Sequence, residues 1–519
     1  MVSCARQTAY NCCLLPPARN RVTAVNILSL TMLRELARLS LPIVVSQGAF
    51  AVMIFTDRWF MSHIDAVHIA AAMGGGVASW FCVSLFVGTI SYANALVAQY
   101  YGAGEIGKCP RVATPGVILA LAFIPLLVVI TYFGGHAFAH LGHDPALVTL
   151  DHDYFYVLMA GSLFTLIKAC FGAYFAGIGG TRVVMVASVL GVMFNIPLSW
   201  LLIFGKWGFP ELGIIGAGVG TIAATLFSIG LFLALYLADD HQRRFRVAEA
   251  WQFDPGIMRR SLRLGLPTSV ESFMNIATFN LYLLMFQSYG VVQGAAMAIV
   301  FNWDMLCFIP MIGLQVGVMS LIGRFVGAGD MTRANQVISS GFILALSYSG
   351  TLVVLFLLFR VQLVDVFSTP DGAFDEIREL ASYMMIGLST YMLADAINLV
   401  SSGALRGAGD TRWIMNMSMT LHWLMLIAQY FVIMVLDLGP RVSWWVFVAM
   451  LVSLYRLLTV DIDNPEELEE LQGSEAMRKL PESLQYIREN LGEIRSQGVV
   501  NYCWDEADLK TLGEFVGKS

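Results

Sequence analysis

Long apolar segments alternate with short polar connections along most of this chain. About twelve of the segments have the length, about 20 residues, that a helix needs to cross the hydrocarbon core of a bilayer. The predicted segments are 36–62, 70–99, 113–134, 148–177, 183–204, 214–238, 262–289, 294–323, 335–358, 376–404, 412–436 and 441–458. The pattern therefore predicts an all-α polytopic membrane protein.

A long polar break, from Asp239 to Arg263, interrupts this pattern near its middle. It contains the six arginines Arg243, Arg244, Arg246, Arg259, Arg260 and Arg263. A basic run of this kind is typical either of a nucleic-acid-binding patch or of a linker. Because six apolar segments lie on each side, we interpret 239–261 as a basic linker between two six-helix bundles, 34–238 and 262–458.

The two halves also repeat each other. The recurring strings are Leu41-Pro42 with Leu266-Pro267, YGAGE (101–105) with VGAGD (326–330), and GIGGTR (177–182) with GAGDTR (407–412). Their offsets are 225, 225 and 230 residues. Six spans in each copy give both copies the same orientation, which predicts a parallel internal repeat and a substrate site between the halves.

Positive charges gather in alternate connections, which predicts the orientation in the membrane. One set of connections holds Lys108, Arg111, Arg182, the linker arginines, Arg324, Arg333, Arg406 and Arg412. The opposite set holds little beyond Lys206, Arg360 and Arg441. Since Lys and Arg mark cytoplasmic connections, we expect the linker and both termini on the cytoplasmic side of the inner (plasma) membrane.

The composition agrees with a membrane protein and argues against several other classes. The chain is 57% hydrophobic and 13% charged, whereas soluble domains carry about 25% charged residues. Its eight cysteines show neither zinc-ligand spacing nor a disulfide framework. The three near the N-terminus, Cys4, Cys12 and Cys13, are either lipidation sites or incidental.

Both ends of the chain differ from the apolar region. We expect residues 1–33 to form a cytoplasmic N-terminal segment. Residues 459–519 are acidic and have leucines and isoleucines at helical spacing, which predicts a short soluble helical tail. Regulation, partner binding and passive solubilisation are all consistent with such a tail.

The string from Gly102 to Gly107 matches GxGxxG, the dinucleotide-binding pattern. That pattern needs a preceding strand, but here it follows an apolar helical segment, and its repeat copy lacks the third glycine. We therefore interpret these glycines as the end of a helix and the start of a sharp turn.

Among the acidic residues within the apolar segments, four stand out: Asp57, Glu271, Asp304 and Asp395. An ionisable side chain near the bilayer centre costs about 2.5–3.5 kcal/mol, which pairing or protonation relieves. This cost favours a functional role for these four residues. The structural alternatives are an ion pair of Asp57 with Arg58 or a place near the outer interface, and hydrogen bonding between helices for Glu271 and Asp304.

Oxygen-bearing side chains accompany these acids at helical spacing. Tyr391 lies four residues before Asp395 and Asn398 three after it, so all three share a helix face. Asn195 and Ser199 are also four residues apart, with a proline between them. Oxygen groups beside a carboxylate suit a hard cation such as Na⁺, or a proton relay.

Several motifs, taken in order, resemble those of the MATE (multidrug and toxic-compound extrusion) family, nearest its NorM-type branch. They are LSLPIVVSQ, FTDRWFMS, LVAQYYGAGE, GVMFNIPLSW, LRLGLP, GRFVGAGD and GALRGAGDTR, and the resemblance covers residues 34–458. It implies two six-helix bundles that form a V, and export of organic cations in exchange for Na⁺ or H⁺.

The resemblance also implies which residues couple the cation or proton. Asp57 matches the family's acid in the first helix, and Asn195 matches the amide in the fifth. Ser199 stands where the NorM-type branch often has a second asparagine. Tyr391 and Asp395 match the branch's cation-site pair in the second bundle.

The seventh helix departs from the family pattern. The position aligned from Pro267 is Asn275, and the nearest acid, Glu271, lies one helical turn earlier. Asp304 lies in FNWDMLCFIP, outside the branch pattern. We expect Glu271, Asn275 and Asp304 to line a substrate cavity.

We therefore predict a secondary active antiporter that exports organic cations or drugs. It is expected to be monomeric, with the bilayer and small cations as its partners, no nucleic acid and no cofactor beyond coupling Na⁺ or H⁺. A flippase or exporter of lipid-linked or anionic cargo is the nearer alternative, although intramembrane Lys and Arg are scarce. An intramembrane enzyme is the distant alternative, because the chain shows neither HExxH nor a nucleophile motif.

Overall fold

The computed structural model describes residues 29–138, 145–250, 252–368 and 374–458. Within these ranges the chain is helical with short connections and contains no strand. The acidic tail and most of the N-terminal segment considered above lie outside the described residues.

The first half of the chain forms one bundle, the N-lobe. Its elements are α2 (Leu30–Ser62), α3 (Ala66–Ser91), α4 (Ala93–Gly102), η1 (Ile106–Lys108), α5 (Cys109–Ala122), α6 (Ile124–Ala137), α7 (Pro145–Ala160), α8 (Ser162–Gly177), α9 (Thr181–Phe204), η3 (Lys206–Gly208) and α10 (Ile214–Tyr236).

The polar break contains α11 (Asp239–Phe245) and η4 (Val247–Glu249), and the second half of the chain forms the C-lobe. The elements of the C-lobe are α12 (Pro255–Gln287), α13 (Val291–Gly327), α14 (Met331–Asp365), α15 (Phe374–Ala408), α16 (Thr411–Tyr430), the π-helical turn η5 (Phe431–Val435) and α17 (Pro440–Leu458). Because α12 begins at Pro255, Arg259 and Arg260, expected in the linker, lie in its first turns, whereas Arg243 and Arg244 lie in α11.

Twelve helical rods account for the twelve predicted apolar segments. Eight described helices, or helix pairs in line, are long and apolar enough to cross a membrane. Two more rods are bent pairs: α5–α6 bends by 41° and α7–α8 by 45°. The arginine-bearing α12 and the shorter apolar α17 complete the twelve, so the predicted all-α membrane fold is confirmed.

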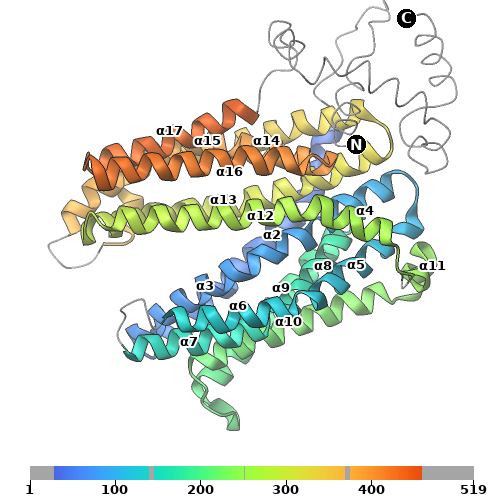
Figure 1. Cartoon of the computed structure of the whole chain (residues 1–519), viewed down its shortest axis with the longest axis horizontal. Coiled ribbons are helices and arrows are strands. Elements are labelled where there is room, and N and C mark those ends of the chain that lie inside the picture. The colour runs from blue at the N-terminus through green and yellow to red at the C-terminus, as the bar shows by residue number, and fades with distance from the viewer. Residues whose placement is uncertain (1–28, 139–144, 251, 369–373, 459–519) are drawn as a thin grey trace, which may run out of the picture.

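The two lobes meet near one end of the molecule and diverge toward the other (Figure 1). We call the end that carries α11 and η4 the linker end. Contacts between the lobes join α2 with α13, α3 with α12 and α4 with α13. The residues in close contact lie in the linker-end halves of these helices, as Val44 with Gly313 and Gly88 with Ser269 illustrate.

These contacts are reciprocal, as the sequence repeat requires. Gly88 packs against Ser269, and Gly313 packs against Val44. Both members of the second pair lie 225 positions from their counterparts in the first, the offset found in the sequence. The parallel repeat therefore relates the two lobes by an approximate two-fold axis that passes through their interface.

The glycines of the GxGxxG string form a helix end and a turn. Gly102 is the last residue of α4, and Gly104 follows with φ +76°, a backbone conformation that favours glycine. The repeat copy has the same turn, with φ +72° at Gly329. The interpretation of this string as a helix terminus is confirmed, since a helix and not a strand precedes it.

Candidate functional site

The N-lobe encloses a group of polar side chains around Asp57, which we call the N-lobe acidic site. Asp57 lies near the end of α2 that is far from the linker, and its side chain is only 5% exposed. Thr221 of α10 donates a hydrogen bond of 3.2 Å to Asp57 Oδ2. The hydroxyl of Ser199 in α9 also faces the Asp57 carboxyl group. Three helices therefore hold this site together.

Asn195 joins the same site through Ser199. Its Nδ2 donates a hydrogen bond of 3.1 Å to Ser199 Oγ, so the predicted four-residue spacing does bring the two side chains together. Gly220 makes room for them, because a β-carbon there would overlap Ser199 Oγ. Two buried oxygens of the site, Asp57 Oδ1 and Asn195 Oδ1, have no hydrogen-bond partner among the described residues. Such oxygens fit a small cation or a proton.

One structural alternative for Asp57, an ion pair with Arg58, is not supported. Among the described residues, no ion pair joins Asp57 to Arg58, since Asp57 Oδ2 is bound by Thr221 and Asp57 Oδ1 has no partner. The other alternative, a place near the outer interface, stays open: Asp57 is buried within the N-lobe, but it lies only five residues from the end of α2 that is far from the linker.

The C-lobe encloses a second group, the C-lobe acidic site, formed by Asp304, Tyr391, Asp395 and Asn398. Tyr391 and Asp395 of α15 and Asp304 of α13 lie close enough for their charges to interact. The buried Tyr391 hydroxyl and Asn398 Oδ1 have no well-formed hydrogen bond to a described residue. The structure thus places Asp304 beside the predicted Tyr391–Asp395 pair.

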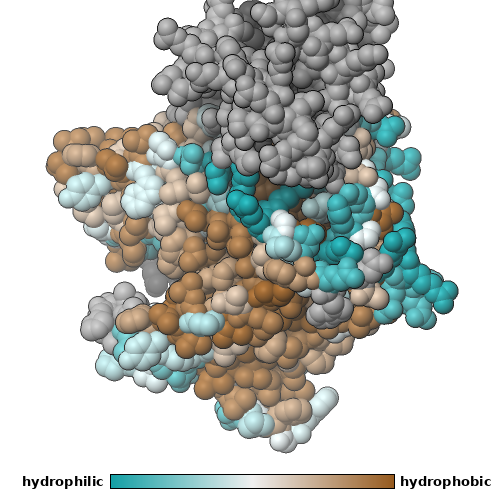
Figure 2. Space-filling model, turned by 45° about the vertical axis from the view of Figure 1, so that its right-hand side comes forward, coloured by the Kyte–Doolittle hydropathy of each residue, from teal (hydrophilic) through white to brown (hydrophobic). Residues whose placement is uncertain are grey.

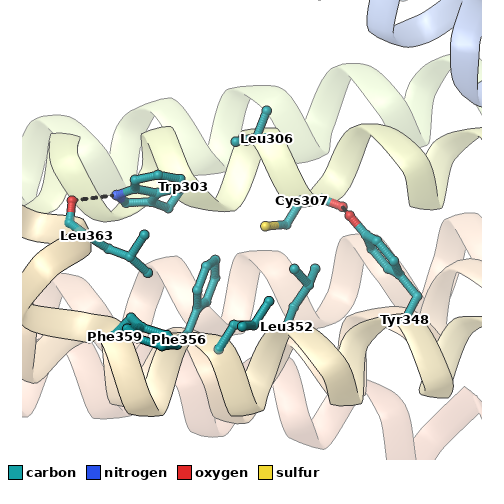
Figure 3. Close-up of a pocket in the computed structure, with 9 residues that line it drawn as sticks. Trp303, Leu306, Cys307, Tyr348, Leu352, Phe356, Phe359 and Leu363 are labelled. Atoms are coloured by element: carbon teal, nitrogen blue, oxygen red, sulfur yellow. Dashed lines mark hydrogen bonds between the residues drawn. The ribbon is translucent and has the colours of Figure 1, made fainter. Parts of the chain in front are cut away.

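An apolar crevice of about 390 Å³ lies between α13 and α14, next to the C-lobe acidic site. Figure 3 shows that Trp303 and Cys307 of α13 face Leu352 and Phe356 of α14 across it. The Trp303 indole N–H donates a hydrogen bond of 3.2 Å to the carbonyl oxygen of Leu363, beyond a break in α14. Cys307 lies near Asp304, so the crevice offers apolar surface beside a carboxyl group.

Glu271 and Asn275 belong to a third polar group, away from Asp304. Glu271 is 4% exposed and accepts a hydrogen bond of 3.0 Å from Arg406 Nη2 in α15. Asn275 Oδ1 accepts one of 3.0 Å from the hydroxyl of Ser418 in α16. The structure does not bring the three side chains together, because Asp304 packs toward Tyr391 while Glu271 and Asn275 face α15 and α16. That they line a substrate cavity stays a prediction.

The Glu271–Arg406 pair is part of a network that joins the lobes at the linker end. Tyr92 of the N-lobe donates to the backbone carbonyl of Arg406 at 3.1 Å, and Gln99 Nε2 donates to the carbonyl of Gly407 at 2.8 Å. Arg260 of α12 donates in turn to Gln99 Oε1 at 2.7 Å. We call this set the linker-end network.

Two residues of these polar groups, Thr221 and Arg406, were not predicted from the sequence. Thr221 lies in an apolar helix with no distinguishing pattern, and only the packing of α10 against the N-lobe brings it to Asp57. Arg406 was noted only as a basic residue of a connection. The internal repeat did distinguish Arg406, because the equivalent residue in the first copy of the repeat is the uncharged Ala176.

Comparison with known proteins agrees with this geometry. The MatE family model matches residues 42–201 in the N-lobe and 267–431 in the C-lobe, which together make up more than half of the chain. The chain belongs to the MatE family. This MatE chain is therefore a membrane transporter and not an enzyme, and the resemblance seen in its motifs is confirmed.

Curated relatives of this MatE chain include two bacterial transporters. It is 26% identical over 420 residues to the multidrug resistance protein NorM of Photobacterium profundum, a match that covers 79% of this chain and 91% of NorM. It is 26% identical over 443 residues to the multidrug resistance protein MdtK of Yersinia pseudotuberculosis, with coverage of 83% and 94%. These matches support the NorM-type assignment.

Solved structures share the fold of this MatE chain. One is described as an outward-facing conformation of a multidrug resistance MATE family transporter of the MOP superfamily, with a TM-score of 0.74 and 19% identity. Another is a MOP superfamily transporter from Pyrococcus furiosus, also with a TM-score of 0.74 and 19% identity. Each match covers 85% of this chain and 97% of the solved chain.

Proposed function

We propose that this MatE chain is a secondary active antiporter that exports organic cations or drugs in exchange for Na⁺ or H⁺. The observation that carries the proposal is the pair of acidic sites, one in each lobe. Asp57 is buried, Asp304 and Asp395 are half-buried, and each site contains buried polar oxygens with no well-formed hydrogen bond to a described residue. The names of NorM and MdtK, both multidrug resistance proteins, support the class of cargo.

The acidic sites supply the coupling chemistry. A carboxyl group in a membrane-buried place is costly as a lone anion, so it favours either a bound proton or a bound cation. In the N-lobe acidic site, Asp57 would hold the charge while Asn195 and Ser199 supply neutral oxygens. A cationic substrate competes for the same negative charge, and this competition links the two fluxes.

The arrangement of the lobes supports alternating access. Close contacts and hydrogen bonds between the lobes gather at the linker end, as Gln99 with Gly407 illustrates, while the lobes diverge toward the other end (Figure 1). A V of this kind opens to one side of the membrane. Rocking about the approximate two-fold axis, with release of the linker-end network, would open it to the other side.

The orientation of the chain follows from its charges. Hydrophilic residues gather at the linker end, and a broad hydrophobic surface extends away from it (Figure 2). The arginine-rich connections at the linker end support a cytoplasmic location for this end. The chain would then lie in the inner membrane as a monomer, with both termini in the cytoplasm and its V open to the outside.

The charge of the interior favours cations over the anionic or lipid-linked cargo of a flippase. The two acidic sites contain Asp57, Asp304 and Asp395. Arg406 is paired with Glu271, and few other cations lie within the described spanning helices, Arg58 and Lys168 among them. An exporter of anions would instead be expected to line its interior with unpaired arginine and lysine.

Transport in everted membrane vesicles tests the proposal. Efflux of a fluorescent organic cation would be followed under separately imposed Na⁺ and proton gradients, for the wild type and for Asp57→Asn and Asp395→Asn. We expect both variants to lose transport under the gradient that drives the wild type. The matched control is Asp240→Asn, an exposed linker carboxylate that should leave transport unchanged. Wild-type rates in both site variants would exclude the carboxylate mechanism.

A further inference from the structure

A basic and apolar groove lies at the linker end of the C-lobe, away from the acidic sites. Its volume is about 650 Å³. Its lining includes three arginines and three large apolar side chains: Arg259, Arg263, Arg412, Phe253, Leu262 and Leu266. The antiport mechanism proposed above does not involve this groove.

The three arginines are exposed and have no hydrogen bond or ion pair to another described residue. Their neighbour Arg260 differs, because it is engaged by Gln99 in the linker-end network.

The nearest carboxylates in sequence are occupied by helix capping. Asp254 Oδ1 accepts from the backbone N–H groups of the first turn of α12, and Asp410 Oδ1 from that of Trp413 in α16. No carboxylate is among the residues that line the groove, so its three arginines give it a net positive charge.

Charge and apolar surface are ordered along α12. Arg259 and Arg263 are one turn apart, as are Leu262 and Leu266, so each pair follows the same face of the helix. The helix starts at the linker end and runs into the bundle, which places Leu266 about 10 Å deeper than Arg259 at 1.5 Å per residue. Arg412 adds a third charge from the first turn of the adjacent α16.

We propose that this groove binds the headgroup phosphate of an anionic phospholipid, with an acyl chain lying along Leu262 and Leu266. Basic pockets beside membrane-spanning helices bind such headgroups, and the depth order of charge and apolar surface matches that of a lipid. Leu266 is 45% exposed on a spanning helix, and Phe253, 55% exposed, is an aromatic residue of the kind found at the membrane interface. A free anion or an acidic peptide would use the arginines and leave this apolar lining exposed.

The internal repeat supplies a matched control. Arg34 and Arg38 in α2 lie 225 positions before Arg259 and Arg263, and Arg182 begins α9 as Arg412 begins α16. All three are exposed. Neutralising them removes the same charge from the same end of the protein without touching the groove.

Native mass spectrometry of the full chain, supplied with phosphatidylglycerol or phosphatidylcholine of the same acyl length, tests the proposal. We expect the wild type to retain phosphatidylglycerol preferentially. Each basic residue near an anionic membrane surface contributes about fivefold in affinity, so Arg259→Gln/Arg263→Gln/Arg412→Gln should lower that preference at least about tenfold. The triple lysine variant should keep most of it, and Arg34→Gln/Arg38→Gln/Arg182→Gln should keep all of it.

Other occupants predict different outcomes. Competition by millimolar inorganic phosphate would identify the groove as a free-anion site and overturn the proposal. So would equal retention of the two lipids by the wild type, or an equal loss of preference in the control variant. If the wild type shows no preference and the groove variant makes the acidic tail more sensitive to protease, the groove binds the tail instead. None of these measurements depends on transport. Failure of the lipid-site proposal can therefore be distinguished from failure of the antiport mechanism.

Discussion

Gly102, the last residue of α4, lies directly against the backbone carbonyl of Arg324 in α13, and a β-carbon at this position would overlap that oxygen. One repeat further along the chain, Gly327 lies against the carbonyl of Gln99 in the same way. The two contacts are related by the approximate two-fold axis of the molecule. Together they fix how closely the lobes approach at the linker end.

Replacing Gly102 by alanine should force the lobes apart at this contact. Overpacking a tight contact costs about 1–3 kcal/mol, so we expect a lower melting temperature of the purified protein and slower transport. Gly327→Ala should have a similar effect, because it disturbs the repeat-related contact. The control is Gly172→Ala in α8, where a β-carbon would meet no atom within 4 Å. Equal effects of all three substitutions would show that helical glycine itself, and not the lobe contact, matters.

The carboxyl groups of the C-lobe acidic site should act as one unit, because Asp304 and Asp395 share the neighbour Tyr391. Groups in one network show non-additive effects. We expect Asp304→Asn and Asp395→Asn each to reduce cation efflux in vesicles at least about tenfold, and the double variant to be little worse than either single one. Strictly multiplicative losses would mean that the two carboxyl groups work independently.

Removing the charge of Glu271 should destabilise the protein more than it alters cargo recognition. Arg406 is only 17% exposed, and an uncompensated charge of this kind costs about 3–5 kcal/mol. Glu271→Gln should therefore lower the melting temperature, and adding Arg406→Gln should restore part of it. Arg333→Gln is the control, because its pair with Asp330 is exposed and contributes about 0–1 kcal/mol. A melting temperature unchanged by Glu271→Gln would show that the pair contributes nothing.

Much of the fold could be predicted because it follows from one-dimensional patterns. Apolar length predicts the helical rods, and the repeated GAG strings predict two equivalent lobes. The Tyr391–Asp395 and Asn195–Ser199 pairs were predictable for the same reason, since four-residue spacing within one helix fixes a shared face.

Contacts between helices were not predictable, because they depend on how the rods pack and rotate. The spacing within α13 gives no sign that Asp304 faces Tyr391 rather than the space between the lobes. The pairing of Glu271 with Arg406 joins residues 135 positions apart, from α12 and α15. The bends within α5–α6 and α7–α8 were not predicted, although Pro125 and Gly161 stand at the two breaks.

The linker should respond to pH through His241 of α11. Its Nε2 lies 2.9 Å from the hydroxyl of Tyr174 at the end of α8, and its ring stacks on Phe245 at 4.5 Å. Burial, and then the nearby Arg244, lower the pKa of His241 below its ordinary value of 6.5. The docked linker therefore favours the neutral imidazole, whereas an undocked linker takes up a proton once the pH falls below 6.5.

Because the undocked linker binds the proton on His241 more tightly, docking of α11 is strongest above pH 6.5 and becomes weaker as the pH falls below that value. Hydrogen exchange of residues 239–245, corrected for the intrinsic effect of pH, should therefore be faster at pH 5.5 than at pH 7.5. His241→Gln should remove this difference, because glutamine cannot titrate in that range. His136→Gln, in α6, should preserve it. Equal corrected exchange at both pH values in the wild type would mean that His241 does not control the docking of α11 against α8.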